Sequence, residues 1–590
     1  MKPDAGCGPD GIAPGTLNLL PHTWLLFLLT ILNTLFLTGG YPVAWTFSKL
    51  IMLFKKGLTM CCGNYRGISI IDCIAKCYDY ILNNRLMKWY IPCREQAGGQ
   101  EKRGCIEHIV TVRLVIDRCL RLKIPLFIVF VDFSKAYDRV PRNYLLKLLK
   151  SLGCGAVMLT ALTSLFCVTQ FILGSTIITA VLGVKQGSPT SCFLFILFVD
   201  EFIRLVKSSV DVDGFLEWLH LLMLMDDTVI FATSRERLCQ KLNVLATWCN
   251  RSGMVLNEDK TEFMAIGAEP CDKSPIVLHL HHGIVHVKHC SEYKYLGAII
   301  TSDGKISTSM TKHTSSKEKD MNKLTIFLQR NKNAPYAVKK VVVDACFNSS
   351  LLYGCESWLG VKPNGTLNSM YMKAVKMLLG VRQSTTNDTC LIEAGYPTLE
   401  ALVRQRQKKF LENMIAERST MEDDPLMFAL KLTENDNPNM HRYIQHLLSE
   451  PASVVERSLS AIKSRVMSSS QTKAITYRTF NPDLSVHPMY NANTAVDDDL
   501  RTAFTRLRLS SHRLRIETGR WSRIERAERL CQCGLDVQSE QHVLSDCDLV
   551  SDIRRAYGFQ RIEWREFMVT EKTEQQLMMV KQILNFYEDT

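Results

Sequence analysis

Apolar runs of strand length recur through the first half of the chain, separated by short polar segments. Residues 126–131, Leu-Phe-Ile-Val-Phe-Val, are β-branched and aromatic, which predicts a buried strand that ends next to Asp132. Residues 221–232 contain two more apolar runs, and the polar turn between them carries Asp226 and Asp227. Because Asp is a common turn residue, we expect these two carboxylates at the tip of a β-hairpin.

The three aspartates are candidate metal ligands. If both segments join one sheet, Asp132, Asp226 and Asp227 come together, and their repulsion is tolerable only with divalent cations between them. Mg²⁺, which prefers oxygen ligands, is the expected ion. A solvated turn is the ordinary alternative for an isolated Asp-Asp pair. Here the pair joins apolar strands where Gly or Asn is the usual turn residue, and the layout is typical of a two-metal nucleotidyl transferase.

The segments around these aspartates resemble the reverse transcriptases of non-LTR retrotransposons. Residues 132–141, Asp-Phe-Ser-Lys-Ala-Tyr-Asp-Arg-Val-Pro, resemble the first palm motif of that family. The other motifs follow in the family's order: fingers motifs at 64–69 and 96–103, the second palm motif at 183–191, the aromatic-x-Asp-Asp motif at 224–227, the lysine-bearing fourth motif at 257–261, and the primer-grip hairpin at 293–297. The resemblance covers roughly residues 8 to 400, and chance rarely imitates so many ordered motifs.

The resemblance implies catalytic roles. Asp132 and Asp226 would bridge two Mg²⁺ ions that clamp the attacking 3′-oxygen and the leaving pyrophosphate, with Asp227 in support. Lys260 would protonate or neutralise the departing pyrophosphate. A lysine beside two acids is, however, more often a solvated surface residue.

The resemblance also implies substrate contacts. Tyr137 would lie against the sugar of the incoming nucleotide and exclude a 2′-hydroxyl, so deoxynucleotides are the expected substrates; the alternative is a core tyrosine with a satisfied hydroxyl. The other candidates are Gln186 and Gly187 for the template and incoming base, Arg66 in the first fingers motif, Lys102 and Arg103 for phosphates, and Tyr295, Leu296 and Gly297 for the primer.

The second palm motif also has a reading independent of the family. Ser188 and Pro189 predict the start of a helix, with the serine hydroxyl capping free amides and the proline in the first turn. Gly187 would let the backbone approach a ligand closely. An ordinary loop that leads into a helix is the alternative.

Two positions depart from the family pattern. Leu224 and Met225 replace the aromatic and the small residue that precede the Asp pair, which makes the hairpin bulkier and aliphatic. In the second fingers motif, Gly98-Gly99-Gln100 stands where Gly-Phe-Arg is expected. That change removes an aromatic ring and a cation from a loop expected to contact template and triphosphate.

Composition agrees with a large intracellular protein that binds a polyanion. The 590 residues exceed one domain, and 46% hydrophobic content supports sizeable cores. A net charge of +12 predicts a polyanionic partner and salt-sensitive binding. The 21 cysteines, without a secretory signal or regular framework, indicate a reduced compartment, in the cytoplasm and nucleus.

The apolar segment Leu17–Leu37 is too interrupted by polar residues to span a membrane, so we expect a buried helix. Because the reverse transcriptase resemblance begins near Gly8, we expect no endonuclease domain. The five histidines between His279 and His289 alternate around Gly283, which favours a small hairpin with exposed imidazoles over a metal site.

The C-terminal region carries a second candidate metal site. Cys531, Cys533, His542 and Cys547 resemble the zinc knuckle that ends related retrotransposon proteins, although one residue between the first two cysteines is tighter than usual, and reduced structural cysteines are the alternative. Eight arginines precede it, with Trp521 among them, and suit contacts with phosphates and unpaired bases or, alternatively, a solvated helix: Arg506, Arg508, Arg513, Arg515, Arg520, Arg523, Arg526 and Arg529.

Together these patterns predict an α+β fold: a right-hand polymerase with fingers, a palm with an antiparallel sheet and a helical thumb, followed by a mostly helical C-terminal region with a small zinc-knuckle-like segment. The expected boundaries are 1–300 for fingers and palm, 301–400 for the thumb, 401–500 for a helical connector, 501–560 for the arginine-rich segment and knuckle, and 561–590 for a C-terminal helix.

The expected activity is RNA-templated DNA synthesis with two Mg²⁺ and a Zn²⁺ in the tail. Its partners would be an RNA template, a DNA primer or nicked target DNA, and dNTPs, with no membrane and with an endonuclease supplied in trans. The alternatives are a catalytically idle or domesticated remnant that binds nucleic acid, and a maturase-like RNA-folding factor. Primer extension separates the first function from both, and selective binding to a structured intron would favour the maturase.

Overall fold

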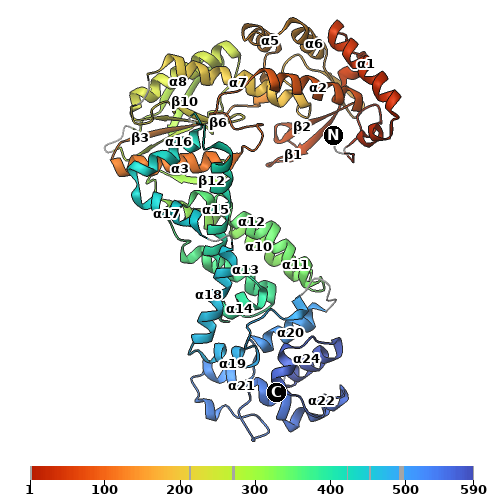
Figure 1. The fold of residues 1–590 in the computed structure, drawn as a ribbon, viewed down its shortest axis with the longest axis vertical. Coiled ribbons are helices and arrows are strands. Elements are labelled where there is room, and N and C mark those ends of the chain that lie inside the picture. The colour runs from red at the N-terminus through yellow and green to blue at the C-terminus, as the bar shows by residue number, and fades with distance from the viewer. Residues whose placement is uncertain are drawn as a thin grey trace. The chain divides into compact units, whose positions relative to one another are not determined.

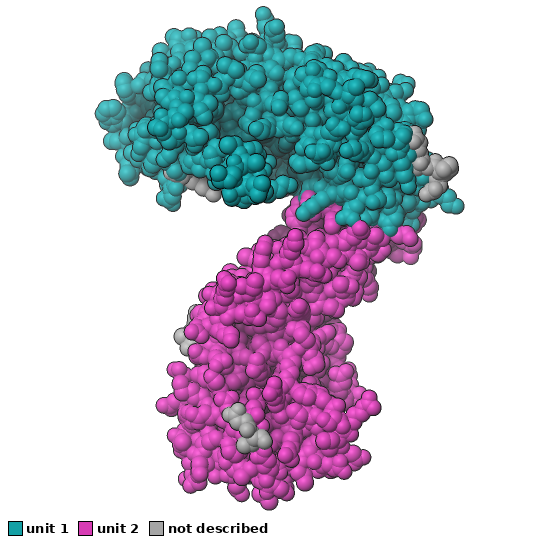
Figure 2. Space-filling view, turned by 180° about the vertical axis from the view of Figure 1, so that it is seen from behind, with its two compact units in different colours: residues 1–296, 300–304, 418–437 teal, residues 297–299, 305–417, 438–590 magenta. Residues whose placement is uncertain are grey.

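The computed structural model describes residues 3–4, 6–211, 214–268, 273–421, 423–450, 453–490 and 497–588. The chain forms two compact units (Figure 2). The first contains residues 1–296, 300–304 and 418–437, and the second contains residues 297–299, 305–417 and 438–590. The chain therefore returns to the first unit at 418–437, inside the segment predicted as a helical connector.

A six-stranded sheet organises the first unit. Its strand order is β6 (Leu221–Leu224), β7 (Asp227–Ala232), β3 (Leu126–Val131), β8 (Glu262–Ile266), β10 (Gly283–His289) and β9 (Ile276–Leu280). The strand predicted at 126–131 is β3, which pairs antiparallel with both β7 and β8. All six of its residues are buried, as the apolar run predicts.

Alternate residues of β3 enter two different cores. Phe127, Val129 and Val131 pack in the core that contains α7 (Pro189–Ser209) and α8 (Arg235–Ser252). The residues between them face α3 (Cys105–Leu122), which covers the opposite side of the sheet together with α16 (Pro425–Asp436) (Figure 1). A run without polar residues therefore forms a strand covered on both faces.

A second, four-stranded sheet completes the first unit. Its order is β2 (Tyr65–Ile71), β1 (Phe47–Phe54), β4 (Gln170–Leu173) and β5 (Thr176–Thr179). The hairpin of β11 (Glu292–Tyr295) and β12 (Ala298–Thr301) forms a separate two-stranded sheet. The helices of this part are α1 (His22–Thr38), α2 (Cys73–Trp89), α4 (Ala136–Arg139), α5 (Arg142–Ser151) and α6 (Ala156–Cys167). β1 pairs antiparallel with β2 and parallel with β4.

The apolar N-terminal segment forms a helix, but the prediction that this helix is buried is wrong. In α1 only Leu32 is buried, whereas Trp24 is 60% exposed and Phe27 is 59% exposed. α1 packs against α6 on one side, and its other apolar side chains face outward. None of the helices in the described ranges has the length and hydrophobicity that crossing a membrane requires.

Every regular element of the described second unit from residue 305 onward is helical. The α-helices are α9 (Ile306–Ser316), α10 (Glu318–Arg330), α11 (Tyr336–Val342), α12 (Ser349–Leu351), α13 (Gly365–Leu379), α14 (Asn387–Ala394), α15 (Leu399–Arg418, whose last residue is in the first unit), α17 (Pro438–Ser449), α18 (Val454–Ser468), α19 (Thr472–Phe480), α20 (Asp498–Arg508), α21 (Arg515–Trp521), α22 (Ser551–Ala556), α23 (Trp564–Val569) and α24 (Glu574–Glu588). One apolar core extends from Met310 to Tyr587. The segments predicted as thumb, connector and tail therefore share a core.

Candidate active site

The structure brings the three predicted carboxylates together. Asp132 directly follows β3, whose last residue, Val131, pairs with Thr228 of β7, next to Asp227. Met225 and Asp226 form the turn between β6 and β7, and Met225 adopts a left-handed φ of 60° to close it. The predicted hairpin is confirmed, with the turn one residue earlier than expected because Asp227 already pairs with Leu224.

The carboxylates are close enough to oppose one another's ionisation. Burial raises the pKa of Asp226, and the charge of Asp132 raises it further. Loss of solvent and then the charges of Asp226 and Asp132 raise the pKa of Asp227 to about 6. Carboxylate oxygens are the type of ligand that Mg²⁺ prefers, and a divalent cation bound among them would relieve this repulsion.

The segment after α8 holds Asp132 in place. Asn257 donates from Nδ2 to Asp132 Oδ2 at 2.9 Å, and its backbone N–H donates to the Asp132 carbonyl at 2.9 Å. Lys260, half exposed, donates from Nζ to Asp132 Oδ2 at 3.1 Å. Lys260 therefore contacts Asp132 while remaining half exposed, and its role towards the pyrophosphate stays a prediction. Asn257 stands in the fourth motif, but nothing in its local sequence indicates that its amide orients the first carboxylate.

Two cations in and beside the four-stranded sheet act electrostatically on Asp226. The positive charges of Arg66 and Lys55 both lower the pKa of Asp226, which places them near its carboxylate. Arg66 lies on β2 opposite Leu53, and Lys55 follows the last residue of β1. Sequence reasoning predicted Arg66 but missed Lys55. The available signal was its position directly after an apolar strand, the same position that Asp132 has relative to β3.

Tyr137 packs against α7 within electrostatic range of Asp226. Its ring stacks on Phe195 of α7, with centroids 4.4 Å apart and planes 15° from parallel. Burial raises the pKa of Tyr137 well above its usual range, and Cys192 and the charge of Asp226 add to the effect. The stacked ring is thus fixed within electrostatic range of Asp226. Its role as a sugar gate stays a prediction.

The second palm motif packs against β2. Gln186 accepts a hydrogen bond at its carbonyl from the Ser69 amide at 2.7 Å, and its side chain donates to Asp138 at 3.2 Å. Gly187 has a φ of 119°, and a Cβ there would lie 2.4 Å from the Ser69 carbonyl oxygen. The glycine therefore permits close approach of β2, which is a different use from the ligand contact expected for it. The template contacts predicted for these residues remain untested.

α7 begins at Pro189 as predicted, but the hydrogen bond expected between the Ser188 hydroxyl and the first amides of α7 does not form. Ser188 is the N-cap residue and makes no side-chain bond to the first amides of α7. Its hydroxyl donates instead to the buried carboxylate of Asp79 in α2. The hydroxyl therefore makes a tertiary contact, with a carboxyl whose pKa is raised by burial.

The departures from the family pattern pack against each other. A Cβ on Gly98 would lie 2.4 Å from Met225 Sδ, and a Cβ on Gly99 would lie 2.5 Å from Cys192 Sγ. The bulky Met225 side chain thus occupies space beside two glycines. Gln96 fixes the same turn, because its Oε1 accepts from the Met225 amide at 2.8 Å.

One predicted phosphate contact is wrong. The Arg103 side chain is 5% exposed and donates to Glu107 Oε1 at 2.8 Å and to the Arg94 carbonyl at 2.7 Å. A guanidinium used in this way does not reach a nucleotide phosphate. Lys102 is exposed, with a left-handed φ of 58°, and its phosphate contact stays a prediction.

The predicted primer-grip residues divide into buried and turn positions. Tyr295 is 3% exposed, and its ring packs on Phe130 of β3 with centroids 5.8 Å apart. Its side chain therefore anchors β11 and is not available to a primer, contrary to the prediction. Leu296 and Gly297 form the turn with φ values of 47° and 90°, and their primer contact remains untested.

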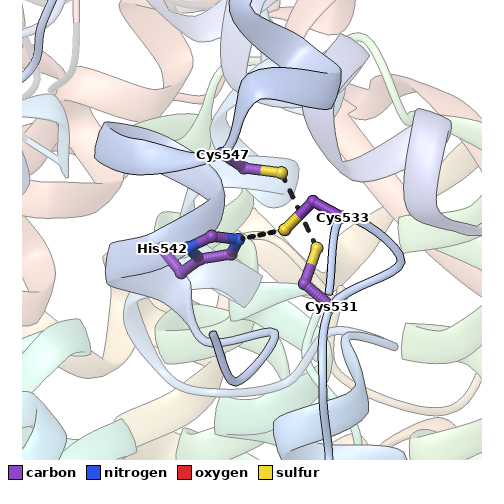
Figure 3. A group of neighbouring side chains, drawn as sticks. All are labelled: Cys531, Cys533, His542 and Cys547. Carbon is purple, nitrogen blue, oxygen red and sulfur yellow. Dashed lines mark hydrogen bonds between the residues drawn. The ribbon is translucent and has the colours of Figure 1, made fainter. Parts of the chain in front are cut away.

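The four predicted zinc ligands converge in the second unit (Figure 3). Their ligand atoms lie within 4.8 Å of one another, with Cys533 Sγ 3.2 Å from His542 Nε2 and Cys531 Sγ 3.6 Å from Cys547 Sγ. Burial opposes ionisation of Cys531, but hydrogen bonds from the backbone at Cys533 and from Tyr587 lower its pKa. Three thiols and one imidazole are a donor set that fits tetrahedral Zn²⁺. The short Cys-x-Cys spacing is accommodated because Gly534 turns the chain with a φ of 75°.

The histidine tract forms the predicted hairpin. It spans β9 and β10, with His279 and His286 exposed on alternate positions. Within the described ranges, the ligand atoms of the Cys531 cluster lie within 4.8 Å of one another, whereas neither the histidine tract nor the three aspartates forms such a group.

The arginine-rich stretch divides into structural and exposed members. Arg508 is 1% exposed and donates to both carboxylate oxygens of Glu393, so the nucleic-acid contact considered for it is wrong. Arg513 is exposed, and Trp521 is 53% exposed with the guanidinium of Arg382 4.5 Å from its ring centroid. The other exposed members are Arg506, Arg515, Arg523 and Arg526, while Arg520 and Arg529 are half-buried.

Comparisons with known proteins agree with this site. The family model described as reverse transcriptase (RNA-dependent DNA polymerase) matches residues 53–300, which include all three carboxylates. The chain is 25% identical over 309 residues to the Pol polyprotein of the type-2 retrotransposable element R2DM of Drosophila melanogaster, covering 51% of this chain and 29% of that protein. It is 26% identical over 322 residues to the RNA-directed DNA polymerase of the mobile element jockey of the same species. That match covers 51% of this chain and 34% of the jockey protein.

The chain thus spans about a third of the length of these two relatives. A solved telomerase structure from Candida albicans aligns with 72% of this chain and 66% of that one, at 13% identity and a TM-score of 0.33. That score is too low to indicate a shared fold.

Proposed function

Residues 53–300 belong to the reverse transcriptase family, and on that premise we propose that this chain catalyses RNA-templated DNA synthesis by two-metal nucleotidyl transfer. The observation that carries the proposal is the convergence of Asp132, Asp226 and Asp227 at one end of the central sheet, with Lys55 and Arg66 facing them. Acidic metal ligands opposite phosphate-binding cations are what phosphoryl transfer to a 3′-hydroxyl requires.

The chain's own groups supply positioning and charge. Asp132 and Asp226 would hold two Mg²⁺, which when bound neutralise the charge on the triphosphate and on the attacking 3′-oxygen. Asn257 keeps the Asp132 carboxylate oriented. Lys55 and Arg66 would bind triphosphate oxygens, and Lys260 would neutralise the departing pyrophosphate.

Sugar selection is assigned to Tyr137. Its ring is held by stacking on Phe195 and lies near Asp226, where the sugar of a nucleotide bound to the catalytic metals would pass. A fixed ring at that position leaves no space for a 2′-hydroxyl. The proposed substrates are therefore dNTPs, an RNA template, and a DNA primer such as the 3′-end of nicked target DNA.

The second unit is proposed to bind nucleic acid. The Cys531 cluster would hold Zn²⁺ and cross-link the loop at 531–534 to the segment at 542–547, which both belong to the apolar core of the second unit. The exposed arginines and Trp521 beside Arg382 supply cations and an aromatic face for an unpaired strand.

Primer extension on an RNA template with Mg²⁺ and dNTPs tests the catalytic proposal, with Asp226→Asn as the matched control. We expect extension by the unmodified chain alone, and salt-sensitive RNA binding by both proteins, because the substitution removes a metal ligand and leaves the basic surfaces. RNA binding without extension by either protein would contradict the proposal and favour the idle remnant. Selective binding of a structured intron without extension would favour the maturase-like factor.

A further inference from the structure

Residues 418–437, which we call the return segment, connect two helices of the second unit but pack within the first. The segment comprises the end of α15, a short loop and α16, and α16 lies along α3. Phe428 packs on Trp218, with centroids 5.1 Å apart, and Leu426 is 1% exposed. The chain thus places a helix from its C-terminal half on the reverse transcriptase domain.

Arg418 begins this segment and is buried among acids. Its side chain is 5% exposed and bonds to Glu107 of α3, which is 3% exposed, and to Asp424, which is 1% exposed, at 3.4 Å. It also donates from Nη2 to the Lys102 carbonyl at 2.7 Å. A buried guanidinium with three acceptors on two different segments fixes those segments relative to each other.

Two of the three acceptors, the Lys102 carbonyl and Glu107, lie in and beside loop 94–104, which carries the second fingers motif. Lys102 is bonded to Arg418 directly. Glu107 shares its other carboxylate oxygen with Arg103, and Arg103 donates to the Arg94 carbonyl at the beginning of the loop. Both ends of the loop are therefore held by one group of buried charges that includes Arg418.

The middle of the same loop is bonded to the catalytic hairpin. Ala97 donates to the Met223 carbonyl at 2.9 Å, and Met223 donates to the Glu95 carbonyl at 2.8 Å, so the loop acts as an additional strand beside β6. The Gln96 side chain accepts from the Met225 amide at 2.8 Å and donates to its carbonyl at 3.2 Å. Met225 directly precedes Asp226.

We propose that Arg418 is a positioning residue: through loop 94–104 it holds the β6–β7 turn and thereby sets the position of the Asp226 carboxylate. The proposal rests on the proposed function for its kinetic consequence, but its structural consequence is independent of activity. It makes the geometry of the catalytic carboxylates depend on the docking of a segment that lies more than a hundred residues beyond the matched domain.

The test compares three variants of the full chain. Arg418→Ala removes the bonds to Glu107 and Lys102, and Arg418→Lys keeps the charge with fewer donors. Arg118→Ala is the matched control, because Arg118 bonds to Asp436 at 2.5 Å at the other end of the return segment and does not contact loop 94–104. If the return segment acted only by packing on the first unit, and not through loop 94–104, Arg418→Ala and Arg118→Ala would have the same effects on the β6–β7 turn.

Hydrogen exchange is the first measurement, since it needs no activity. In Arg418→Ala we expect the amides of Ala97, Met223 and Met225 to exchange about tenfold faster, because local opening is no longer opposed by the anchored loop. The exchange rates of these amides should be unchanged in Arg118→Ala and should be intermediate in Arg418→Lys. Unchanged exchange in Arg418→Ala, or equal acceleration in Arg118→Ala, would overturn the proposal.

Single-nucleotide addition is the second measurement. For Arg418→Ala we expect kcat to fall about 10- to 100-fold, the loss typical of a displaced catalytic group, while the KM for primer-template stays within about twofold. A loss of primer-template affinity with kcat unchanged would overturn the positioning role. If the unmodified chain shows no addition, the proposed function fails, and the exchange result still decides the structural half of the inference.

Discussion

Lys260 Nζ lies 3.1 Å from Asp132 Oδ2, so the lysine of the fourth motif is ion-paired with the first catalytic carboxylate. Asn257, three residues earlier, bonds to the same oxygen. A cation at Asp132 occupies a lone pair that a divalent metal would use. A divalent metal and Lys260 would therefore compete electrostatically for the same carboxylate.

This competition predicts opposite effects of Lys260→Ala on metal binding and on catalysis. Without nucleotide, the variant should bind Mg²⁺ about two- to fivefold more tightly, because the free energy of an exposed ion pair no longer opposes metal binding. The rate of nucleotide addition should fall about 10²-fold because the leaving group loses its cation. Calorimetric Mg²⁺ titration and single-turnover kinetics measure the two effects, with Lys150→Ala, an exposed lysine of α5, as control. Unchanged Mg²⁺ affinity would show that the ion pair does not compete.

Tyr137 should decide which sugar is accepted. Tyr137→Ala removes the ring stacked on Phe195 and should raise ribonucleotide incorporation relative to deoxynucleotide by roughly 10- to 100-fold. Tyr137→Phe keeps the ring and should leave selectivity unchanged, because the ring, rather than the hydroxyl, excludes the 2′-oxygen. Incorporation assays with paired rNTP and dNTP series measure the ratio. Selectivity that changes in the Phe variant would assign discrimination to the hydroxyl.

Repulsion among the carboxylates should make stability depend on pH. The pKa of Asp227 is about 6 in the folded chain, raised from 3.8, so the fold disfavours its ionised form. The resulting destabilisation is absent below pH 3.8 and complete above about pH 6. Asp227→Asn should therefore raise the thermal midpoint more at pH 7.5 than at pH 5, and saturating Mg²⁺ should remove the gain. An equal gain at both pH values would indicate a cause other than charge.

Zinc content should follow the cysteine cluster. Purified protein is expected to hold about one zinc ion per chain, and Cys533→Ser should remove it, because four ligands are needed for a closed structural site. Cys346→Ser, which alters an exposed cysteine outside the cluster, is the control and should keep the metal. Elemental analysis distinguishes the two. Protein without zinc before any substitution would identify the cluster as reduced structural cysteines.

Two arginines from the same stretch should behave differently. Arg513→Ala removes an exposed cation and should weaken binding to single-stranded RNA and lower the salt slope by about one. Arg508→Ala leaves buried Glu393 without its main partner and should reduce the free energy of unfolding by about 3–5 kcal/mol, with the salt slope of the folded protein unchanged. Fluorescence anisotropy across a salt series and thermal unfolding measure these effects. A normal slope for Arg513→Ala would remove that residue from the RNA-binding surface.

The local sequence was sufficient to predict a strand, a helix start or a turn wherever the element's own residues decide its conformation. The short, β-branched and aromatic run of β3 favours a buried strand over a helix, Pro189 can begin a helix but not continue one, and a pair of aspartates between two strands marks their turn. The order of the motifs indicated a resemblance to reverse transcriptases, and that resemblance implied roles for the three carboxylates and for Tyr137. These features depend on neighbours a few residues away.

The partners of long polar side chains were decided by the tertiary structure. Arg508 finds Glu393 across 115 residues, and Arg418 finds Glu107 across 311. The Ser188 hydroxyl bonds to Asp79, 109 residues away, instead of capping its own helix. A sequence shows that such a group can bind an ion, a phosphate or a carboxylate, but it does not show which acceptor folding brings within reach.

The sequence by itself therefore determined the strand that presents Asp132, the turn that presents Asp226, and the types of ligand in the tail. Only the tertiary structure decided that Asn257 and Lys260 contact Asp132, that the charges of Arg66 and Lys55 act on Asp226, and that the return segment reaches back to loop 94–104. The physical reason is that hydrophobic periodicity is a local property, whereas the choice among charged and hydrogen-bonding partners is made by contacts between distant segments.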